Sequence, residues 1–301
     1  YKIIYMNIFQ ILILSSILLV ICFIIFSVWF SYRHSREIYK PKHKRKNLEI
    51  FPDQLKLPFH QAIFKTKDNV KLNGWFLPSE GSEKTIILMH GWSMNKGDIF
   101  DKTTFLHSLG YNLFYFDFRG TGESGGISSV GYKETKDLQA AIDYLHHTQP
   151  DACKEIGIYG ISMGAAIGIY HTAKKGGIKC IVTESPYYSY EVVVARWAWI
   201  HKKIPYFPFV WLALKFAKKH FKINPEYYSP SKNIADVKVP IFFIYGRNDA
   251  LVPIINARKL LNKVNKPKDL WVIPGAEHAK CAETGGKEYQ KRISQFFKKH
   301  L

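Results

Sequence analysis

The stretch GIYGISMGAAIG, residues 157–168, surrounds a single serine, Ser162, with glycine and alanine. Its centre matches the pattern G-x-S-x-G. The residues before it, EIGIYG, have the composition of a β-strand, and those after it, MGAAIGIYHTA, have that of a helix. A sharp strand–turn–helix connection is the setting in which a serine nucleophile projects from the end of a sheet. A purely structural glycine-rich turn is the alternative interpretation.

The small residues around Ser162 have a physical role in such a turn. A sharp turn leaves little room for a Cβ atom, so we expect glycine to be required at Gly160 and Gly164. The backbone N–H of Met163, at the start of the expected helix, would point toward an oxyanion bound beside Ser162. The turn therefore predicts a nucleophile together with one donor of an oxyanion hole.

A serine hydroxyl is a weak nucleophile until a base accepts its proton. The candidate base is His278 in IPGAEHAK, a loop after the last expected strand. The candidate acid is Asp249 in IFFIYGRNDALVP, directly after a continuous apolar run, and it would orient the imidazole. A turn or helix-capping role is the alternative for Asp249, and Glu184 is the alternative acid. Ser162, Asp249 and His278 each follow a separate expected strand, where open α/β sheets place their sites.

A second donor for the oxyanion is expected in TIILMHGWSMN, residues 85–95. The expected strand ends at His90 and the chain turns at Gly91, which presents the N–H of Trp92 toward the serine turn. His90 has no cluster of further ligands around it in the sequence, so we expect it to support the loop rather than bind a metal.

The segment FDFRGTGES, residues 116–124, contains two glycines that suggest a phosphate-binding loop. No Walker lysine follows them, which argues against that interpretation. We expect Asp117 and Arg119 to brace the loops around the site instead.

Strand-like and helix-like segments alternate from about residue 60 onward, which is typical of a mostly parallel sheet covered on both faces. The expected strands are 60–65, 71–77, 84–89, 112–117, 155–159, 179–183, 240–245 and 269–273. The expected helices are 98–109, 132–147, 163–174, 253–264 and 285–299. The first two strands flank KDN, a hairpin signal.

One long interval interrupts this alternation, and we expect an insertion at about 186–232. Within it, residues 192–222 are rich in apolar and aromatic side chains and carry seven Lys/Arg and no acid. Pro205 and Pro208 divide the segment into two helices. We interpret it as a cap over a pocket with a membrane-facing surface, and ordinary packing helices are the alternative.

Residues 8–30 carry no charge. As a helix they extend about 35 Å, enough to cross a hydrocarbon core of about 30 Å. A cleaved signal peptide is the alternative, although the apolar run is long and no A-x-A site follows it. Residues 33–46 contain seven Lys/Arg and one acid, whereas only Lys2 precedes the apolar run. Because positive charge stays on the cytoplasmic side, we expect a single-pass anchor with the large domain in the cytoplasm.

The charge distribution sets the expected partners. The formal net charge is +19, and the basic segment after the apolar run would bind anionic lipid head groups. We do not expect nucleic acid as a partner, because a membrane helix adjoins that segment directly. The expected organisation is an anchor over 1–32, a basic tether over 33–54 and one α/β domain over 55–301.

The chain has four cysteines, Cys22, Cys153, Cys180 and Cys281. They form neither a CxxC motif nor a Cys/His cluster, which argues against a zinc site or a disulfide framework and fits a reducing compartment. We expect neither a metal nor an organic cofactor.

Taken together, the segments HGW, DFRGTGES, GISMGA, GRNDALVP and GAEHA resemble the α/β-hydrolase superfamily in their order and spacing over about residues 55–301. Within it the chain resembles membrane-anchored bacterial hydrolases of the serine-aminopeptidase-like and prolyl-oligopeptidase-like type. The resemblance implies an α/β-hydrolase fold with a helical cap. It also implies Ser162 as nucleophile, Asp249 as acid and His278 as base, with the amides of Met163 and Trp92 as oxyanion hole.

These observations predict a serine hydrolase that acts through an acyl-enzyme. The aromatic cap favours a small-molecule or lipid-like acyl ester as substrate, and the apolar helix favours a substrate near the membrane. A serine peptidase or amidase is the alternative enzyme, and a catalytically inactive binding module is the non-enzymatic alternative.

Overall fold

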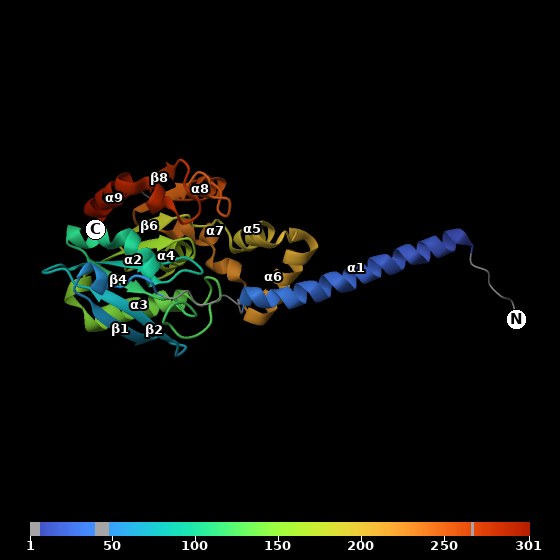
Figure 1. The fold of residues 1–301 in the computed structure, drawn as a ribbon, viewed down its shortest axis with the longest axis horizontal. Helices are drawn as coiled ribbons and strands as arrows, with labels where there is room; N and C mark the ends of the chain where they lie inside the picture. Colours follow the sequence, from blue (N-terminus) through green and yellow to red (C-terminus); the bar gives the residue numbers. More distant parts are fainter. Residues whose placement is uncertain (1–6, 40–47, 266–267) are drawn as a thin grey trace.

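A computed structural model describes residues 7–39, 48–265 and 268–301 of the chain. Its centre is an eight-stranded sheet with the order β1-β2-β4-β3-β5-β6-β7-β8 (Figure 1). The strands are β1 (His60–Lys65), β2 (Lys71–Leu77), β3 (Lys84–Met89), β4 (Asn112–Phe116), β5 (Glu155–Ile161), β6 (Cys180–Glu184), β7 (Ile241–Gly246) and β8 (Lys268–Ile273). Strand β2 runs antiparallel to both of its neighbours, and the pairs from β4 to β8 are parallel. The predicted mostly parallel sheet is confirmed.

The hairpin between β1 and β2 forms at the predicted KDN turn. The register pairs Lys65 with Lys71. The hydroxyl of Thr66 donates to Asp68 (2.7 Å) and accepts from the N–H of Val70 (3.0 Å), which satisfies the polar groups of the turn. The local sequence is therefore sufficient to reverse the chain here.

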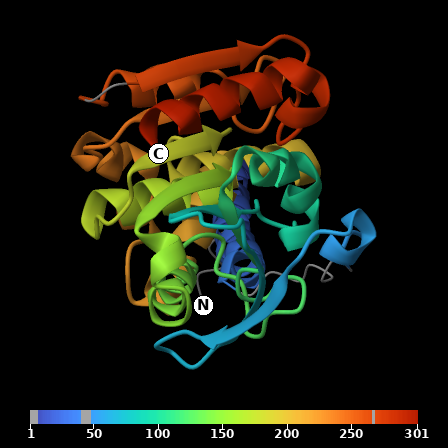
Figure 2. The same cartoon turned by 90° about the vertical axis from the view of Figure 1, so that its left-hand side faces the viewer.

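Helices cover both faces of the sheet (Figure 2). The apolar side chains of α3 (Thr135–Thr148), α4 (Met163–Lys174) and α8 (Ile255–Leu261) join the core on one face, and those of α2 (Lys96–Thr103) and α9 (Cys281–His300) join it on the other. Successive strand residues point to opposite cores, which is why the strand sequences are continuously apolar. The shorter helical elements are η1 (Pro52–Leu55), η2 (Thr104–Leu109), η3 (Asp151–Cys153), η5 (Pro225–Tyr228), α7 (Pro230–Asn233) and η6 (Ile234–Asp236).

Of the five predicted helices, 163–174 has the expected bounds, whereas 132–147 is found as Thr135–Thr148 and 253–264 as Ile255–Leu261. The helix expected over 98–109 begins at Lys96, because the Asn95 side chain accepts the N–H groups of residues 97 and 98, and it becomes a 3₁₀-helix after Thr103. The last helix, expected over 285–299, begins at Cys281 and continues through a kink at Gly286, where φ is 50°.

The predicted insertion contains the two expected helices. They are α5 (Tyr190–Lys202) and α6 (Trp211–Phe221). The turn η4 (Tyr206–Val210), which follows Pro205 and contains Pro208, separates them. In Figure 1 both helices lie at the side of the sheet from which the long N-terminal helix α1 projects, and α6 packs against the inner end of α1. This cap therefore joins the α/β body to α1.

Helix α1 (Ile8–Tyr39) projects away from the body (Figure 1). Its segment Ile8–Ile38 is long and apolar enough to cross a membrane, a property that it shares with signal sequences. The helix continues past residue 32, where the anchor was expected to end, so the first residues of the expected tether are helical. Residues 40–47 of that tether lie outside the described residues.

Candidate active site

Ser162 occupies a strained turn between β5 and α4. Its φ of 50° and ψ of −105° are rare for a residue with a side chain, and such conformations cluster at active sites. A Cβ added at Gly160 would lie 2.6 Å from the N atom of Ala165, and one added at Gly164 would lie 2.5 Å from the Met89 carbonyl oxygen. Both positions require glycine because backbone atoms, which cannot swing away, occupy the space.

His278 and Asp249 lie beside this turn. His278 follows β8 and Asp249 follows β7 at the carboxyl edge of the sheet. His278 Nε2 is 3.0 Å from Ser162 Oγ, and His278 Nδ1 is 2.7 Å from Asp249 Oδ2. The carboxylate therefore accepts from Nδ1–H, which leaves Nε2 to accept the hydroxyl proton of Ser162. This arrangement is able to activate a hydroxyl as a nucleophile.

The carboxylate of Asp249 also stabilises its own turn. Its Oδ1 accepts the N–H of Val252 at 2.6 Å, so the turn-capping role considered from the sequence is present as well. The neighbouring backbone joins the histidine loop, because the N–H of Asn248 donates to the Ala276 carbonyl at 2.9 Å. These bonds fix the aspartate relative to the imidazole.

Glu184, the alternative acid, lies beneath the serine turn in a separate buried cluster. Its carboxylate accepts the hydroxyls of Tyr159 and Tyr289, both at 2.8 Å, and the N–H of Cys281 at 3.2 Å. Burial raises the pKa of both tyrosines well above the usual value, so both phenols stay protonated and donate. The Glu184 carbonyl accepts the N–H of Ser162 at 2.8 Å. Glu184 thus supports the turn, while the imidazole meets Asp249.

The two segments that carry the expected oxyanion donors lie close to Ser162. Met163 is the first residue of α4, so its N–H has no partner within the helix. In the second segment, a Cβ added at Gly91 would lie 3.6 Å from the Ser162 Cβ, which places the loop before Trp92 against the serine. Both segments therefore lie beside Ser162, and the role of the two amides as an oxyanion hole stays a prediction.

His90 is fully buried under the Gly91–Trp92 turn. Its Nδ1 is 2.7 Å from the Gly91 carbonyl, and its Nε2 accepts the N–H of Phe118 at 3.1 Å, so Nδ1 carries the proton. Burial lowers the pKa of His90 and keeps the ring neutral. These contacts are those of a loop-supporting residue.

Asp117 and Arg119 connect the loops around the site. Asp117 Oδ2 accepts from Lys96 Nζ at 2.7 Å, and Arg119 pairs with Asp137 and Asp68. The contacts of Asp117 and Arg119 are the bracing contacts expected from the sequence. Sequence reasoning missed Lys96, which is fully buried, because a lysine in a polar loop gives no sign of burial.

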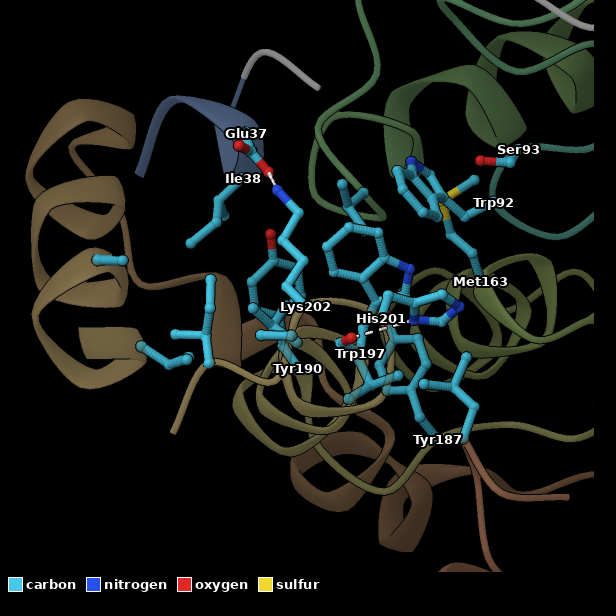
Figure 3. A pocket seen from close by; sticks show the side chains of 18 of the residues that line it. Glu37, Ile38, Trp92, Ser93, Met163, Tyr187, Tyr190, Trp197, His201 and Lys202 are labelled. Carbon is cyan, nitrogen blue, oxygen red and sulfur yellow. Dashed lines mark hydrogen bonds and ion pairs between the residues drawn. The ribbon is translucent and has the colours of Figure 1, made fainter. Parts of the chain in front are cut away.

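A pocket of about 800 Å³ opens beside Ser162 and His278. Its lining is mostly apolar and comes from the sheet edge, from the cap and from α1. Figure 3 shows Trp92 and Met163 at one side, Glu37 at the other, and Trp197 between them. The Trp92 and Trp197 rings meet edge to face at 5.7 Å. The contribution of α1 was not predicted, because no local signal tells which end of an apolar helix folds back on a domain.

Comparison with known proteins agrees with this architecture. The family model of the X-Pro dipeptidyl-peptidases (S15 family) matches residues 32–205, and that of the dienelactone hydrolase family matches residues 127–297. The Bacillus subtilis (strain 168) protein YqkD is 26% identical over 231 residues, which cover 75% of this chain and 74% of YqkD. The α/β hydrolase domain-containing protein WAV2 of Arabidopsis thaliana is 27% identical over 270 residues, 85% of this chain and 83% of WAV2.

A solved structure gives the same result. The Pyrococcus furiosus esterase Pf2001 superposes with a TM-score of 0.73 at 30% sequence identity, and the match covers 86% of this chain and 99% of that one. Two family models that each match more than half of the chain, and an esterase structure that the chain spans almost completely, agree with the sheet and helix architecture described above. The chain therefore belongs to the α/β-hydrolase superfamily of serine hydrolases.

Proposed function

We propose that this hydrolase is a membrane-anchored enzyme that cleaves carboxylic esters through an acyl-enzyme. The observation that carries the proposal is the chain of hydrogen bonds from Ser162 through His278 to Asp249, which opens on a large apolar pocket. In this proposal Ser162 is the nucleophile, His278 the base and Asp249 the acid. An inactive binding module would not need these three groups aligned.

The reaction follows from the positions of these atoms. Ser162 Oγ bonds to the ester carbonyl carbon while His278 Nε2 takes the hydroxyl proton, and the N–H groups of Met163 and Trp92 stabilise the negative oxygen. The carbon–oxygen bond to the alcohol then breaks, and the imidazolium returns its proton to the departing oxygen. Water attacks the acyl-enzyme in the same way and releases the carboxylic acid and free Ser162.

An ester is favoured over a peptide by the character of the pocket. An enzyme that binds a free amino terminus needs a carboxylate to pair with the ammonium. Among the described lining residues, Glu37 is a carboxylate, and it pairs with Lys202. A peptidase is the second candidate, because the X-Pro dipeptidyl-peptidase family model matches residues 32–205.

Membrane anchoring is supported by how α1 meets the body. Ser27, Ser31 and Ser35 are buried, although the side chains of residues 8–26 are exposed. Packing of its inner end on the folded domain favours a helix that the mature protein retains over a cleaved signal. The basic charge after the apolar run favours the catalytic domain on the cytoplasmic side. A reporter fused to the C-terminus that proves extracytoplasmic would contradict this orientation.

The proposal is tested by covalent labelling with a fluorophosphonate probe. Wild-type protein and the matched variant Ser108→Ala, whose hydroxyl is on the surface, are expected to label equally, and Ser162→Ala is expected not to label. Labelling that is independent of Ser162 would refute the proposed nucleophile. Rates on p-nitrophenyl esters compared with aminoacyl anilides then separate an esterase from a peptidase.

A further inference from the structure

The pocket beside Ser162 has a wall made by the apolar helix. Phe30, Ser31, His34, Glu37 and Ile38, from the last turns of α1, line the same cavity as Ser162 and His278. Figure 3 shows this end of α1 across the cavity from Trp92 and Met163. The cavity thus extends from the reactive hydroxyl to the helix that we propose crosses the membrane.

The cap is attached to α1 by direct packing. The ring of Phe209, in η4, lies 6.3, 6.2 and 5.1 Å from those of Phe23, Phe26 and Phe30, which lie along one side of α1. At the pocket rim, Lys202 of α5 forms an ion pair with Glu37 of α1 (Figure 3). The cap and α1 therefore form one unit around the pocket.

These contacts place η4, the turn that joins the two cap helices, at the depth of the membrane. An apolar layer of about 30 Å takes up about 20 helical residues. Since residues 8–30 are uncharged, Phe23 and Phe26 fall within or at the edge of that layer, and Phe209 lies against them. The adjacent Phe207 is 70% exposed. An exposed aromatic side chain at this level is typical of a surface that inserts into the interface.

The pocket connects this layer to the protein surface. Phe30 and Phe209, at the edge of the layer, line it, and so do Glu37, His201 and Lys202, which are at least partly exposed. Glu37 lies about 10 Å beyond Phe30 along α1, so the exposed rim lies just outside the apolar layer. At about 800 Å³ the pocket is at the upper end of the volumes that enclose a whole small-molecule ligand. An acyl chain is an occupant that is both long enough to follow this apolar path and present in the bilayer beside its rim.

We infer that the substrate is a long-chain acyl ester taken from the bilayer, whose chain enters between the cap and α1 and lies against α1 while its carbonyl reaches Ser162. In this arrangement α1 is part of the acyl-binding site as well as an anchor. The inference rests on the proposed ester hydrolysis at Ser162. It goes beyond that proposal by naming the bilayer as the source of the substrate and α1 as the part of the pocket that selects its acyl chain.

The first test changes the α1 wall in the full-length protein. Ser31→Leu adds bulk to the buried wall, and Ser16→Leu is the matched control, an exposed serine on the same helix that does not line the pocket. With enzyme in phosphatidylcholine vesicles, Ser31→Leu is expected to lower the ratio of kcat/KM for p-nitrophenyl palmitate to that for p-nitrophenyl acetate at least tenfold. Ser16→Leu should leave the ratio unchanged. An unchanged ratio in Ser31→Leu would overturn the role of α1.

A second variant guards against misfolding. Ala213→Leu fills the same pocket from α6, on the cap side, and is expected to change the ratio in the same direction. If Ser31→Leu loses its cooperative thermal transition, two other variants decide the outcome. They are Ala213→Leu and Phe30→Ala, which removes a ring from the α1 wall and enlarges the pocket. Ratios equal to wild type in both would refute the pocket assignment.

The second test concerns the route of entry. Enzyme and p-nitrophenyl palmitate are reconstituted either in the same phosphatidylcholine vesicles or in separate populations that are then mixed. Entry from the bilayer predicts hydrolysis at least tenfold faster in shared vesicles, and equal rates would refute it. Activity that persists in Ser162→Ala would refute the proposed function, whereas Ser162-dependent activity without chain-length or vesicle dependence would refute this inference alone.

Discussion

The carboxyl edge of the sheet and the α1–cap layer face one another across a single pocket, yet they are built differently. At the edge, Ser162 and Asp249 are buried. The Ser162 N–H donates to the Glu184 carbonyl at 2.8 Å, and the Asp249 carboxylate accepts the N–H of Val252 at 2.6 Å, which fixes both turns. In the cap, Trp199 and Phe207 are 56% and 70% exposed, and a proline-containing turn joins the two helices. In our proposal, positioning of the reacting atoms depends on the buried edge, and binding of the acyl group depends on the less buried layer.

This difference predicts two kinds of mutational effect. Substitutions at the sheet edge should lower activity on every ester alike, because they act on the reacting atoms. Substitutions in the α1–cap layer should act according to the length of the acyl group, because they change contacts that a short ester does not make.

The largest effect is expected for Ser162→Ala. Removal of the nucleophile should lower kcat/KM by about 10⁴-fold or more for short and long esters together. Steady-state kinetics on p-nitrophenyl acetate and laurate measure this, with Ser108→Ala as the unaffected control. A loss confined to the long ester would contradict the view that the sheet edge acts on every ester alike.

The two buried carboxylates at the edge provide the next test. Asp249→Asn should lower kcat about 10²- to 10⁴-fold with little change in KM, because the imidazole loses the group that orients it and stabilises its charge. Glu184→Gln should instead lower stability by about 1–3 kcal/mol while kcat falls less than tenfold. Kinetics and thermal unfolding of both variants test this distinction. A larger loss of kcat in Glu184→Gln than in Asp249→Asn would make Glu184 the acid of the triad.

The serine turn is expected to be intolerant of added volume. Gly164→Ala should destabilise the fold by about 1–3 kcal/mol and lower activity, since the new Cβ meets the Met89 carbonyl oxygen. Gly168→Ala, one turn along the same helix, meets flexible side chains at 3.1 Å and should stay within about 1 kcal/mol of wild type. Denaturant titration of the pair measures the contrast, and equal stabilities would argue against a rigid edge.

Lowering the pH should reduce the free energy of unfolding of the α/β domain through the buried residue His171. Burial and the neighbouring Lys175 lower the pKa of His171 to about 4, below its unfolded value of about 6.5. The stabilising effect of the neutral ring is therefore present above pH 6.5 and is lost as the pH falls toward 4. Between pH 7 and 5 the wild type should lose about 2 kcal/mol more than His171→Gln. Identical pH profiles from denaturant unfolding would contradict the assignment.

The smallest effect is expected in the cap. Trp197→Ala removes a ring from the pocket and should change the ratio of long- to short-ester kcat/KM by about three- to tenfold. Trp199→Ala is the matched control, an exposed tryptophan of the same helix that lies outside the pocket lining. If the ratio changed equally in the two variants, the cap would act through its stability instead of through contact with the acyl group.

The sheet was predictable because each strand carries its own signal. Three strands, 60–65, 71–77 and 84–89, begin and end where they were expected, since β-branched and aromatic runs stop at turn residues. The neighbourhood of Ser162, Asp249 and His278 was predictable for a related reason. Parallel strands bring their carboxyl ends to one edge, so residues that directly follow three such strands must approach one another.

Local sequence signals therefore determined the order of strands and helices, the apolar helix and the three residues that follow the strands. Tertiary structure alone decided which carboxylate contacts His278, the burial of Lys96 beside Asp117 and the position of the last turns of α1 in the pocket wall. Each of these depends on a contact between segments far apart in the chain, such as Glu37 with Lys202. Hydrophobic period and capping describe a residue's own segment, whereas such contacts depend on how the complete set of elements packs.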